Sequence, residues 1–221
     1  MEILLSSIAV AFRAAPVYAI YDTQSGPALP AREIVSAWLR AGIRVIQYRH
    51  KDTLRRIHFE ECQELSELVH REGGIFIVDD RADLALFSNA DGVHLGQDDL
   101  PPDAARKLLP TPAIIGFSTH NLLQIREAAA MPIDYLAVGP VYATATKANP
   151  DPVVGTGLVK EARKLTDLPL VAIGGMGGAN ASSVLKAGAD AVAVISGLVV
   201  NCRTTGELET QAREILTSLR T

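Results

Sequence analysis

The chain has 221 residues, of which 48% are hydrophobic and only 5% aromatic, and its 21 basic and 25 acidic residues give a formal net charge of −4. This length suits one α/β barrel domain, and a core built from Ala, Val, Ile and Leu suits parallel strands that are covered on both faces. Because the charges are well mixed and form no basic stripe, we expect no nucleic-acid partner.

The amino-terminal segment and the cysteines both favour a cytoplasmic protein. The apolar stretch Met1–Val10 is too short and too weakly flanked for a signal peptide or a membrane span. Cys62 and Cys202 lie far apart without CxxC spacing, which argues against a disulfide framework and a zinc site. We therefore expect a cytoplasmic location, no membrane partner, and residues 1–15 as an extension before the first strand.

Short apolar runs alternate with longer amphipathic segments along the whole chain. The predicted strands are Val17–Tyr21, Ile43–Tyr48, Ile75–Asp79, Gly92–His94, Ala113–Gly116, Tyr135–Gly139, Leu170–Ile173 and Ala191–Ile195. The predicted helices are Ala31–Ala41, Leu54–Glu72, Ala82–Phe87, Ala104–Leu108, Leu122–Ala130, Leu158–Leu165, Ala181–Ala187 and Glu207–Leu219. Eight β/α units predict a single-domain (β/α)8 TIM barrel over residues 1–221.

A doubly wound open sheet has the same alternation and is the structural alternative. It usually has fewer strands and carries a glycine-rich phosphate loop after its first strand. The segment Asp22–Pro27, which follows the first predicted strand here, has no such glycine pattern. The barrel is therefore favoured.

The exit of the second strand carries the run Gln47-Tyr48-Arg49-His50-Lys51. Alternation along an extended chain leaves Gln47, Arg49 and Lys51 on one side. Two cations on one face suit a polyanion, since Arg donates two parallel hydrogen bonds to phosphate oxygens and Lys acts as a point charge. The alternative is a solvated strand end with ordinary surface cations.

Paired carboxylates follow the third and fourth strands, as Asp79-Asp80 and Asp98-Asp99. Adjacent carboxylates repel unless a cation lies between them, and Mg²⁺ uses few protein oxygens when it also coordinates substrate phosphates. We therefore predict Asp80 and Asp99 as Mg²⁺ ligands. The alternative is that one carboxylate of each pair caps the following helix.

After the fifth strand, Ser118 could bond a ligand, whereas Thr119 or Asn121 is expected to cap the next helix. His120 could be an acid–base group, although a lone His at a loop start is more often structural. After the sixth strand, the run Thr144-Ala145-Thr146-Lys147 offers two hydroxyls and a cation to a phosphate. The long loop that continues to Gly155 could cover the site or be a simple connection.

Glycines follow the seventh strand in Ile173–Gly178 and the eighth in Val194–Gly197. Backbone amides freed by glycine beside a helix N-terminus form the phosphate site that barrels commonly carry after these two strands.

Six motifs, each at a predicted strand exit, together resemble the thiamine phosphate synthase family from about the first strand to the eighth. They are Gln47-x-Arg49-x-Lys51, Asp79-Asp80-Arg81, the run Ala90–Leu100, Gly139-Pro140 with Thr144-x-Thr146-Lys147, Ile173-Gly174-Gly175 and Val194-Ile195-Ser196. The resemblance implies an enzyme that joins a pyrimidine diphosphate to a thiazole phosphate with Mg²⁺. Diphosphate leaves the pyrimidine methylene, and the thiazole nitrogen attacks the resulting cation, so no strong protein nucleophile is required.

The resemblance also implies residue roles. The pyrimidine diphosphate would be held by Gln47, Tyr48, Arg49, His50, Lys51, Asp79, Ser118 and Lys147. The thiazole phosphate would be held by Thr144, Ala145, Thr146, Gly175, Ile195 and Ser196, and Mg²⁺ by Asp80 and Asp99. Arg49, Lys51 and Lys147 would be catalytic, because they stabilise the departing diphosphate.

One position departs from the family, which usually has Asn where this chain has Asp79. An extra negative charge beside a diphosphate weakens its binding unless Arg49, Lys51 or the metal offsets it. Alternatively, Asp79 adds an outer contact to the metal.

Three other functions share this barrel. The first is a thiazole tautomerase-like or regulatory paralogue acting through His120, which is disfavoured because Arg49, Lys51, Asp80 and Asp99 are present. The second is a noncatalytic barrel that binds a phosphate ligand and a protein partner, and the third an unrelated phosphate-binding isomerase. We expect small-molecule substrates and a homo-oligomer.

Overall fold

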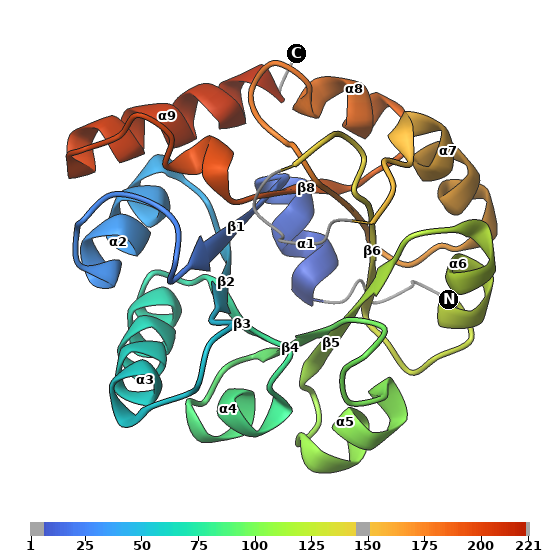
Figure 1. Ribbon diagram of the computed structural model, residues 1–221, viewed down its shortest axis with the longest axis horizontal. Helices are drawn as coiled ribbons and strands as arrows, with labels where there is room; N and C mark the ends of the chain where they lie inside the picture. The colour runs from blue at the N-terminus through green and yellow to red at the C-terminus, as the bar shows by residue number, and fades with distance from the viewer. Residues whose placement is uncertain (1–6, 145–150, 220–221) are drawn as a thin grey trace.

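The computed structural model describes residues 7–144 and 151–219 of the chain. Eight parallel strands pair in the order β1-β2-β3-β4-β5-β6-β7-β8 and close into a barrel, with helices around the outside (Figure 1). The prediction of a single-domain (β/α)8 TIM barrel is confirmed. The doubly wound alternative is wrong, because β1 and β8 pair with each other and leave no open sheet edge.

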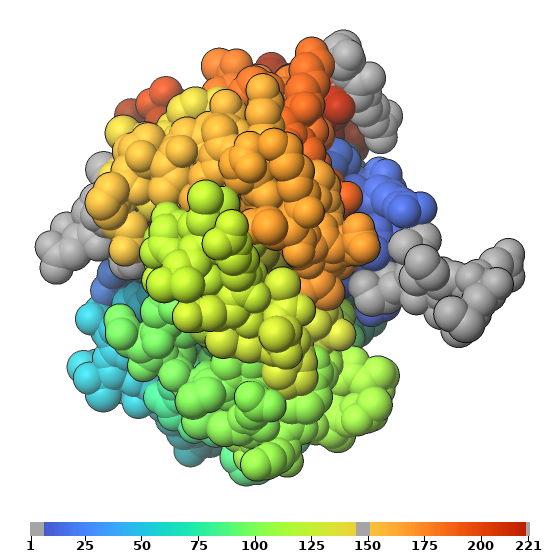
Figure 2. All heavy atoms as spheres, turned by 90° about the vertical axis from the view of Figure 1, so that its right-hand side faces the viewer, coloured from blue at the N-terminus to red at the C-terminus, as the bar shows by residue number. Residues whose placement is uncertain are grey.

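The strands are β1 Val17–Asp22, β2 Val45–Arg49, β3 Ile75–Asp79, β4 Gly92–Leu95, β5 Ile114–Thr119, β6 Tyr135–Val138, β7 Leu170–Ile173 and β8 Ala191–Val194. The helices are α1 Ser7–Ala14, α2 Ala31–Ala41, α3 Arg56–Arg71, α4 Ala82–Phe87, α5 Pro102–Leu108, α6 Leu122–Ala128, α7 Gly155–Leu165, α8 Ala181–Lys186, the 3-10 turn η1 Ser196–Leu198 and α9 Thr205–Ser218. On the side of α6 and α7, helices cover the barrel (Figure 2).

Most predicted boundaries agree with the structure to within three residues. The largest error among the strands is β5, which continues to Thr119 rather than ending at Gly116. Its last two residues are polar and gave no hydrophobic signal, but they pair with β6, and the Thr119 hydroxyl donates to the Ala137 carbonyl. Barrel pairing therefore extends the strand beyond its apolar run.

The helix α1 was not predicted, and in the view down the barrel it appears within the ring of strands (Figure 1). Ile8 and Phe12, which are one turn apart, are fully buried there. The Phe12 ring lies 6.0 Å from the Tyr18 ring and 6.2 Å from the Tyr135 ring. Because Tyr18 and Tyr135 lie near the starts of β1 and β6, α1 closes the amino-terminal end of the barrel.

Two apolar cores result, one between strands and outer helices and one inside the barrel. A glycine makes the interior fit possible, since a Cβ at Gly116 would lie 2.0 Å from the ring of Tyr135. None of the helices in the described ranges is long and apolar enough to cross a membrane.

Candidate active site

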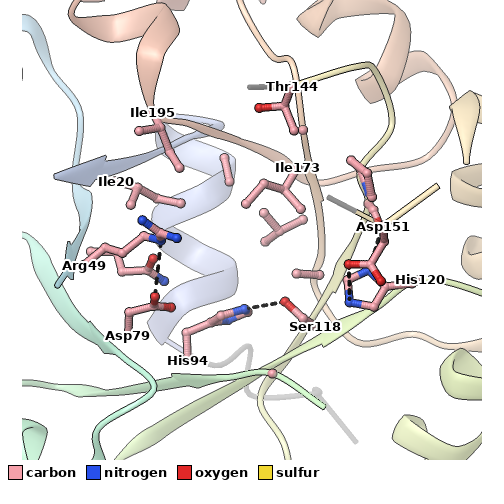
Figure 3. Close-up of a pocket in the computed structure, with 18 of the residues that line it drawn as sticks. Ile20, Arg49, Asp79, His94, Ser118, His120, Thr144, Asp151, Ile173 and Ile195 are labelled. Carbon is pink, nitrogen blue, oxygen red and sulfur yellow. Dashed lines mark hydrogen bonds and ion pairs between the residues drawn. The ribbon is translucent and has the colours of Figure 1, made fainter. Parts of the chain in front are cut away.

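A cavity of about 450 Å³ opens at the carboxyl ends of the strands, where barrels carry their active sites (Figure 3). We call its two sides the polar wall and the apolar wall. The polar wall comes from β2 to β5 and consists of Gln47, Arg49, Asp79, His94 and Ser118. The apolar wall comes from β6 to β8 and consists of Ala137, Val171, Ile173 and Ala193.

Arg49 is held on the polar wall by two carboxylates. The register of β1 and β2 sets it opposite Asp22, and its guanidinium donates to that carboxylate. Its Nε lies 3.5 Å from Oδ2 of Asp79. The Asp22 side chain is only 3% exposed and that of Arg49 15%, so the cation is fixed in direction and little screened by solvent.

Lys51 lies just beyond the end of β2 and reaches the carboxylates that follow β3. Its Nζ is 2.9 Å from Oδ2 of Asp79 and also donates to Oδ2 of Asp80. The prediction that Gln47, Arg49 and Lys51 share one side is confirmed, since all three line the cavity.

Asp79 is the buried carboxyl group of this cluster. Burial raises its pKa to about 6, and repulsion from Asp80 acts in the same direction, while Lys51 and Arg49 hold it down. Asp79 therefore keeps its proton up to a higher pH than an exposed Asp side chain does.

Asp80 and Asp99 meet at the rim, from the loops after β3 and β4. Oδ2 of Asp99 accepts from the Gly96 amide at 2.7 Å. Burial raises the pKa of Asp99, and the adjacent Asp80 carboxyl group raises it further. Two carboxyl groups in contact suit a hard cation placed between them.

Among the described residues, no group of three or more His, Cys, Asp or Glu side chains is arranged to hold a metal ion. Four carboxyl groups of the described rim nevertheless lie around two cations. The carboxyl groups are those of Asp22, Asp79, Asp80 and Asp99, and the cations are Arg49 and Lys51. A divalent cation fits such a site when a ligand or water supplies its remaining oxygens.

The capping alternative fails for both acidic pairs. Helix α4 begins after Arg81 and α5 after Pro101, and neither helix start receives a side-chain cap bond. Asn121, rather than Thr119, caps α6 by accepting from the Gln124 amide.

His120 lines the cavity and makes two contacts with the following segments. Its Nδ1 donates to the Gly139 carbonyl at 2.7 Å, and its Nε2 lies 3.6 Å from Oδ2 of Asp151 (Figure 3). The ring thus ties the end of β5 to the chain after β6, which supports the structural interpretation of this residue.

Polar groups beside the apolar wall come from loops rather than strands. Thr144, Gly175, Ile195 and Ser196, all predicted to contact substrate, line the cavity there. Gly175 has a φ of 62°, and a Cβ on it would lie 2.5 Å from the Ala143 carbonyl oxygen, so only glycine fits without displacement. Ala145, Thr146 and Lys147 lie outside the described residues.

Tyr48 and His50 do not line the cavity, although both were predicted to contact substrate. Strand alternation turns the Tyr48 side chain outward, where its hydroxyl donates to Glu61 at 3.1 Å. The His50 ring bonds the Thr23 hydroxyl at 2.8 Å and contacts the tilted ring of His58, with ring centroids 3.8 Å apart. The predicted contact of Tyr48 and His50 with substrate therefore stays a prediction, and the positions of their side chains do not support it.

Sequence analysis missed Asp22, Tyr18 and His94 as members of the site. Asp22 follows an apolar run, and its role depends on the register with Arg49. Tyr18 and His94 lie within the strands, where the pattern indicates core. Alternation within β1 places Tyr18 on the same side as Asp22, but only the register between strands shows that this side, and the side of His94, face the cavity.

Comparison with known proteins gives a consistent picture. A family model described as thiamine monophosphate synthase matches residues 17–198. The thiamine-phosphate synthase of Synechococcus sp. (strain WH7803) is 47% identical over 167 residues, which are 76% of this chain and 47% of that protein. The thiamine-phosphate synthase of Pelotomaculum thermopropionicum is 45% identical over 167 residues, which are 76% of this chain and 77% of that protein.

The chain spans about half the length of the first three curated relatives that it matches. Among solved structures, the thiamine phosphate pyrophosphorylase of Pyrococcus furiosus superposes with a TM-score of 0.81 at 32% identity, covering 96% of this chain and 100% of that one. A structure described as native KDPGal has a TM-score of 0.72 at 12% identity and is similar in fold alone.

Proposed function

Since the chain belongs to the thiamine monophosphate synthase family, we propose that it catalyses the formation of thiamine phosphate. The substrates are 4-amino-2-methyl-5-(diphosphooxymethyl)pyrimidine and 4-methyl-5-(2-phosphooxyethyl)thiazole, and diphosphate is the second product. The observation that carries the proposal is that Arg49 and Lys51 line the same cavity as the hydrocarbon side chains of the apolar wall. The volume of this cavity is about 450 Å³.

In the proposed reaction, the bond between the pyrimidine methylene carbon and the diphosphate oxygen breaks first, and its electron pair leaves with the diphosphate. The thiazole nitrogen then donates its lone pair to the methylene cation and forms the new carbon–nitrogen bond. No proton has to move in either step. Catalysis therefore depends on stabilising the departing anion and aligning two substrates.

Arg49 and Lys51 are suited to stabilise the diphosphate as it leaves. Both cations are already oriented by carboxylates, so little reorganisation is needed when negative charge develops in front of them. Ser118 and Gln47 present hydrogen-bonding groups from the same wall. The role predicted for Lys147 remains part of the proposal.

Mg²⁺ is the proposed cofactor, held by Asp80 and Asp99. When bound, it supplies positive charge to the diphosphate oxygens. The donor set fits, because two carboxyl groups in contact leave most of the coordination sphere to phosphate oxygens and water.

The apolar wall is suited to the thiazole. Ala137, Val171, Ile173 and Ala193 offer hydrocarbon surface to the ring, and backbone amides near Gly175 and Ser196 offer donors to its phosphate. Water in contact with the methylene cation would capture it, so a dry wall beside the reacting carbon favours the thiazole nitrogen as the nucleophile.

The test is an assay that supplies both substrates, with Mg²⁺ or with a chelator, and follows thiamine phosphate after its oxidation to a fluorescent derivative. We expect product only when the metal is present. No product from folded protein that still binds the thiazole phosphate would contradict the proposal and favour a tautomerase-like or regulatory paralogue.

A further inference from the structure

Along the side and base of the cavity, five side chains from five strands form an unbroken chain of hydrogen bonds. Gln47 Nε2 donates to the Tyr18 hydroxyl at 2.9 Å, and the Tyr18 and Tyr135 hydroxyls are 2.9 Å apart. His94 Nδ1 lies 2.9 Å from the Tyr135 hydroxyl, and His94 Nε2 lies 2.8 Å from the Ser118 hydroxyl (Figure 3). The first four residues are buried, with Tyr135 fully so.

Counting hydrogens gives this chain one direction. The Tyr18 hydroxyl accepts from Gln47, so its single hydrogen is available for Tyr135. Tyr135, having accepted that hydrogen bond, has one hydrogen to donate, and the remaining neighbour is Nδ1 of His94. Nδ1 is then an acceptor, so a neutral His94 carries its hydrogen on Nε2 and donates it to Ser118.

A charged His94 would break this order. Both ring nitrogens would then carry hydrogens, and Tyr135 would receive two donors with no acceptor for its own hydrogen. Burial agrees with a neutral ring, since it lowers the pKa of His94 to about 4. At neutral pH every link of the chain is therefore satisfied in one arrangement.

We propose that Tyr135 is a positioning residue that holds His94 in the Nε2–H tautomer, so that Ser118 accepts from His94 and turns its own hydrogen toward the ligand. Ser118 is then a hydrogen-bond donor to a phosphate oxygen and not an activated nucleophile, because His94 Nε2 has no lone pair with which to take its proton. This inference rests on the proposed function for the identity of the ligand, the pyrimidine diphosphate.

The surroundings of Tyr135 allow the proposal to be tested by removing only its hydroxyl group. Gly116 leaves room for the ring, and Phe12 of α1 contacts it edge-on with an interplanar angle of 84°. Tyr135→Phe keeps these ring contacts and removes only the hydroxyl that orders the chain. Without it, Nδ1 of His94 loses its donor, and either tautomer becomes accessible.

The first experiment measures KM for each substrate in the wild-type chain and in Tyr135→Phe. We expect KM for the pyrimidine diphosphate to rise on the order of tenfold, since one hydrogen bond to a charged group is weakened, and KM for the thiazole phosphate to change less than about twofold. Ser66→Ala is the control, because it removes a buried hydroxyl that donates to the Asn89 carbonyl away from the cavity. It is expected to leave both KM values unchanged.

The second experiment observes the His94 ring by ¹H–¹⁵N NMR at pH 7, with its signals identified by their loss in His94→Gln. We expect the Nε2–H tautomer in the wild-type chain and a mixture in Tyr135→Phe. An Nδ1–H tautomer in the wild-type chain, or an unchanged pyrimidine KM in a folded and active Tyr135→Phe, would overturn the inference. A wild-type chain that binds and converts neither substrate would instead count against the proposed function, and the wild-type NMR result does not depend on turnover.

Discussion

The polar wall and the apolar wall face one cavity but are built by different means. Each strand from β2 to β5 sends a hydrogen-bonding or charged side chain into the cavity, whereas β6 to β8 send only hydrocarbon. Beside the apolar wall, polar contacts fall to loop residues such as Gly175 and Ser196. On the polar wall, charge and hydrogen bonding therefore determine which residue can stand at a position. Beside the apolar wall, the space available to the backbone determines it.

The largest effect is expected from the acidic rim of the polar wall. Asp99→Ala removes one of two carboxylates proposed for Mg²⁺, and we expect kcat/KM to fall by about 10³ or more while the fold remains intact. Steady-state kinetics over a Mg²⁺ series measures this. Asp103→Ala, an exposed position in the first turn of α5, is the control. Unchanged activity in Asp99→Ala would remove Asp99 from the metal site.

The second largest effect is expected from substitution of Arg49. In Arg49→Ala the diphosphate loses a cation, and the buried Asp22 loses its partner. We expect kcat/KM to fall on the order of 10²-fold, and the free energy of unfolding to fall by about 3 kcal/mol. Kinetics and chemical denaturation measure the two effects. Arg32→Ala breaks a pair whose two side chains are each 50% exposed, so it should cost less than about 1 kcal/mol.

The matching change beside the apolar wall is Gly175→Ala. The left-handed backbone and the contact with the Ala143 carbonyl both oppose a Cβ there. We expect KM for the thiazole phosphate to rise about tenfold, with little change for the pyrimidine diphosphate; this loss corresponds to roughly 1.4 kcal/mol. Gly157→Ala is the control, because nothing lies within 4 Å of a Cβ at that position. Equal losses for both substrates would contradict the division of the cavity into two walls.

The smallest effect is expected from Asp79→Asn and depends on pH. The folded-state pKa of Asp79 is raised to about 6 from an unfolded value of 3.8, so ionisation of this group opposes folding. That cost is absent below the unfolded pKa, grows between pH 3.8 and pH 6, and is fully present above pH 6. The Tm advantage of Asp79→Asn over the wild-type chain should therefore increase through this window and then level off. An advantage that shrinks as pH rises would mean that the ionised carboxylate stabilises the fold.

Local signals account for what could be predicted from the sequence. The apolar residues of α2 recur at helical spacing, and the helix is followed by Gly42. The φ of Gly42 is 110° and its amide donates to the carbonyls of Leu39 and Trp38, as in a helix C-cap. The β2 exit is similar, because alternation alone orders Gln47, Arg49 and Lys51.

Features that depend on distant residues could not be predicted in the same way. The eight residues of α1 form a helix whose buried face is matched by rings more than a hundred positions apart along the chain, those of Tyr18 and Tyr135. Tyr48 and His50 belong to the same run as Arg49, and only the closed barrel determines that they face outward. His94 has the appearance of a core residue until its two hydrogen-bond partners are known.

The location of α1 also has a consequence for the order in which the molecule folds. The cluster that receives Ile8 and Phe12 includes residues from β1 through to β8, among them Ala191 and Ala193. Helix α1, which precedes β1 in the described part of the chain, thus has no complete docking surface until β8 has joined the barrel. On this basis α1 docks after the strands have paired, and protection of its amides from hydrogen exchange during refolding should appear only with barrel closure. Protection that precedes the pairing of β8 with β1 would show that α1 docks on a partial barrel.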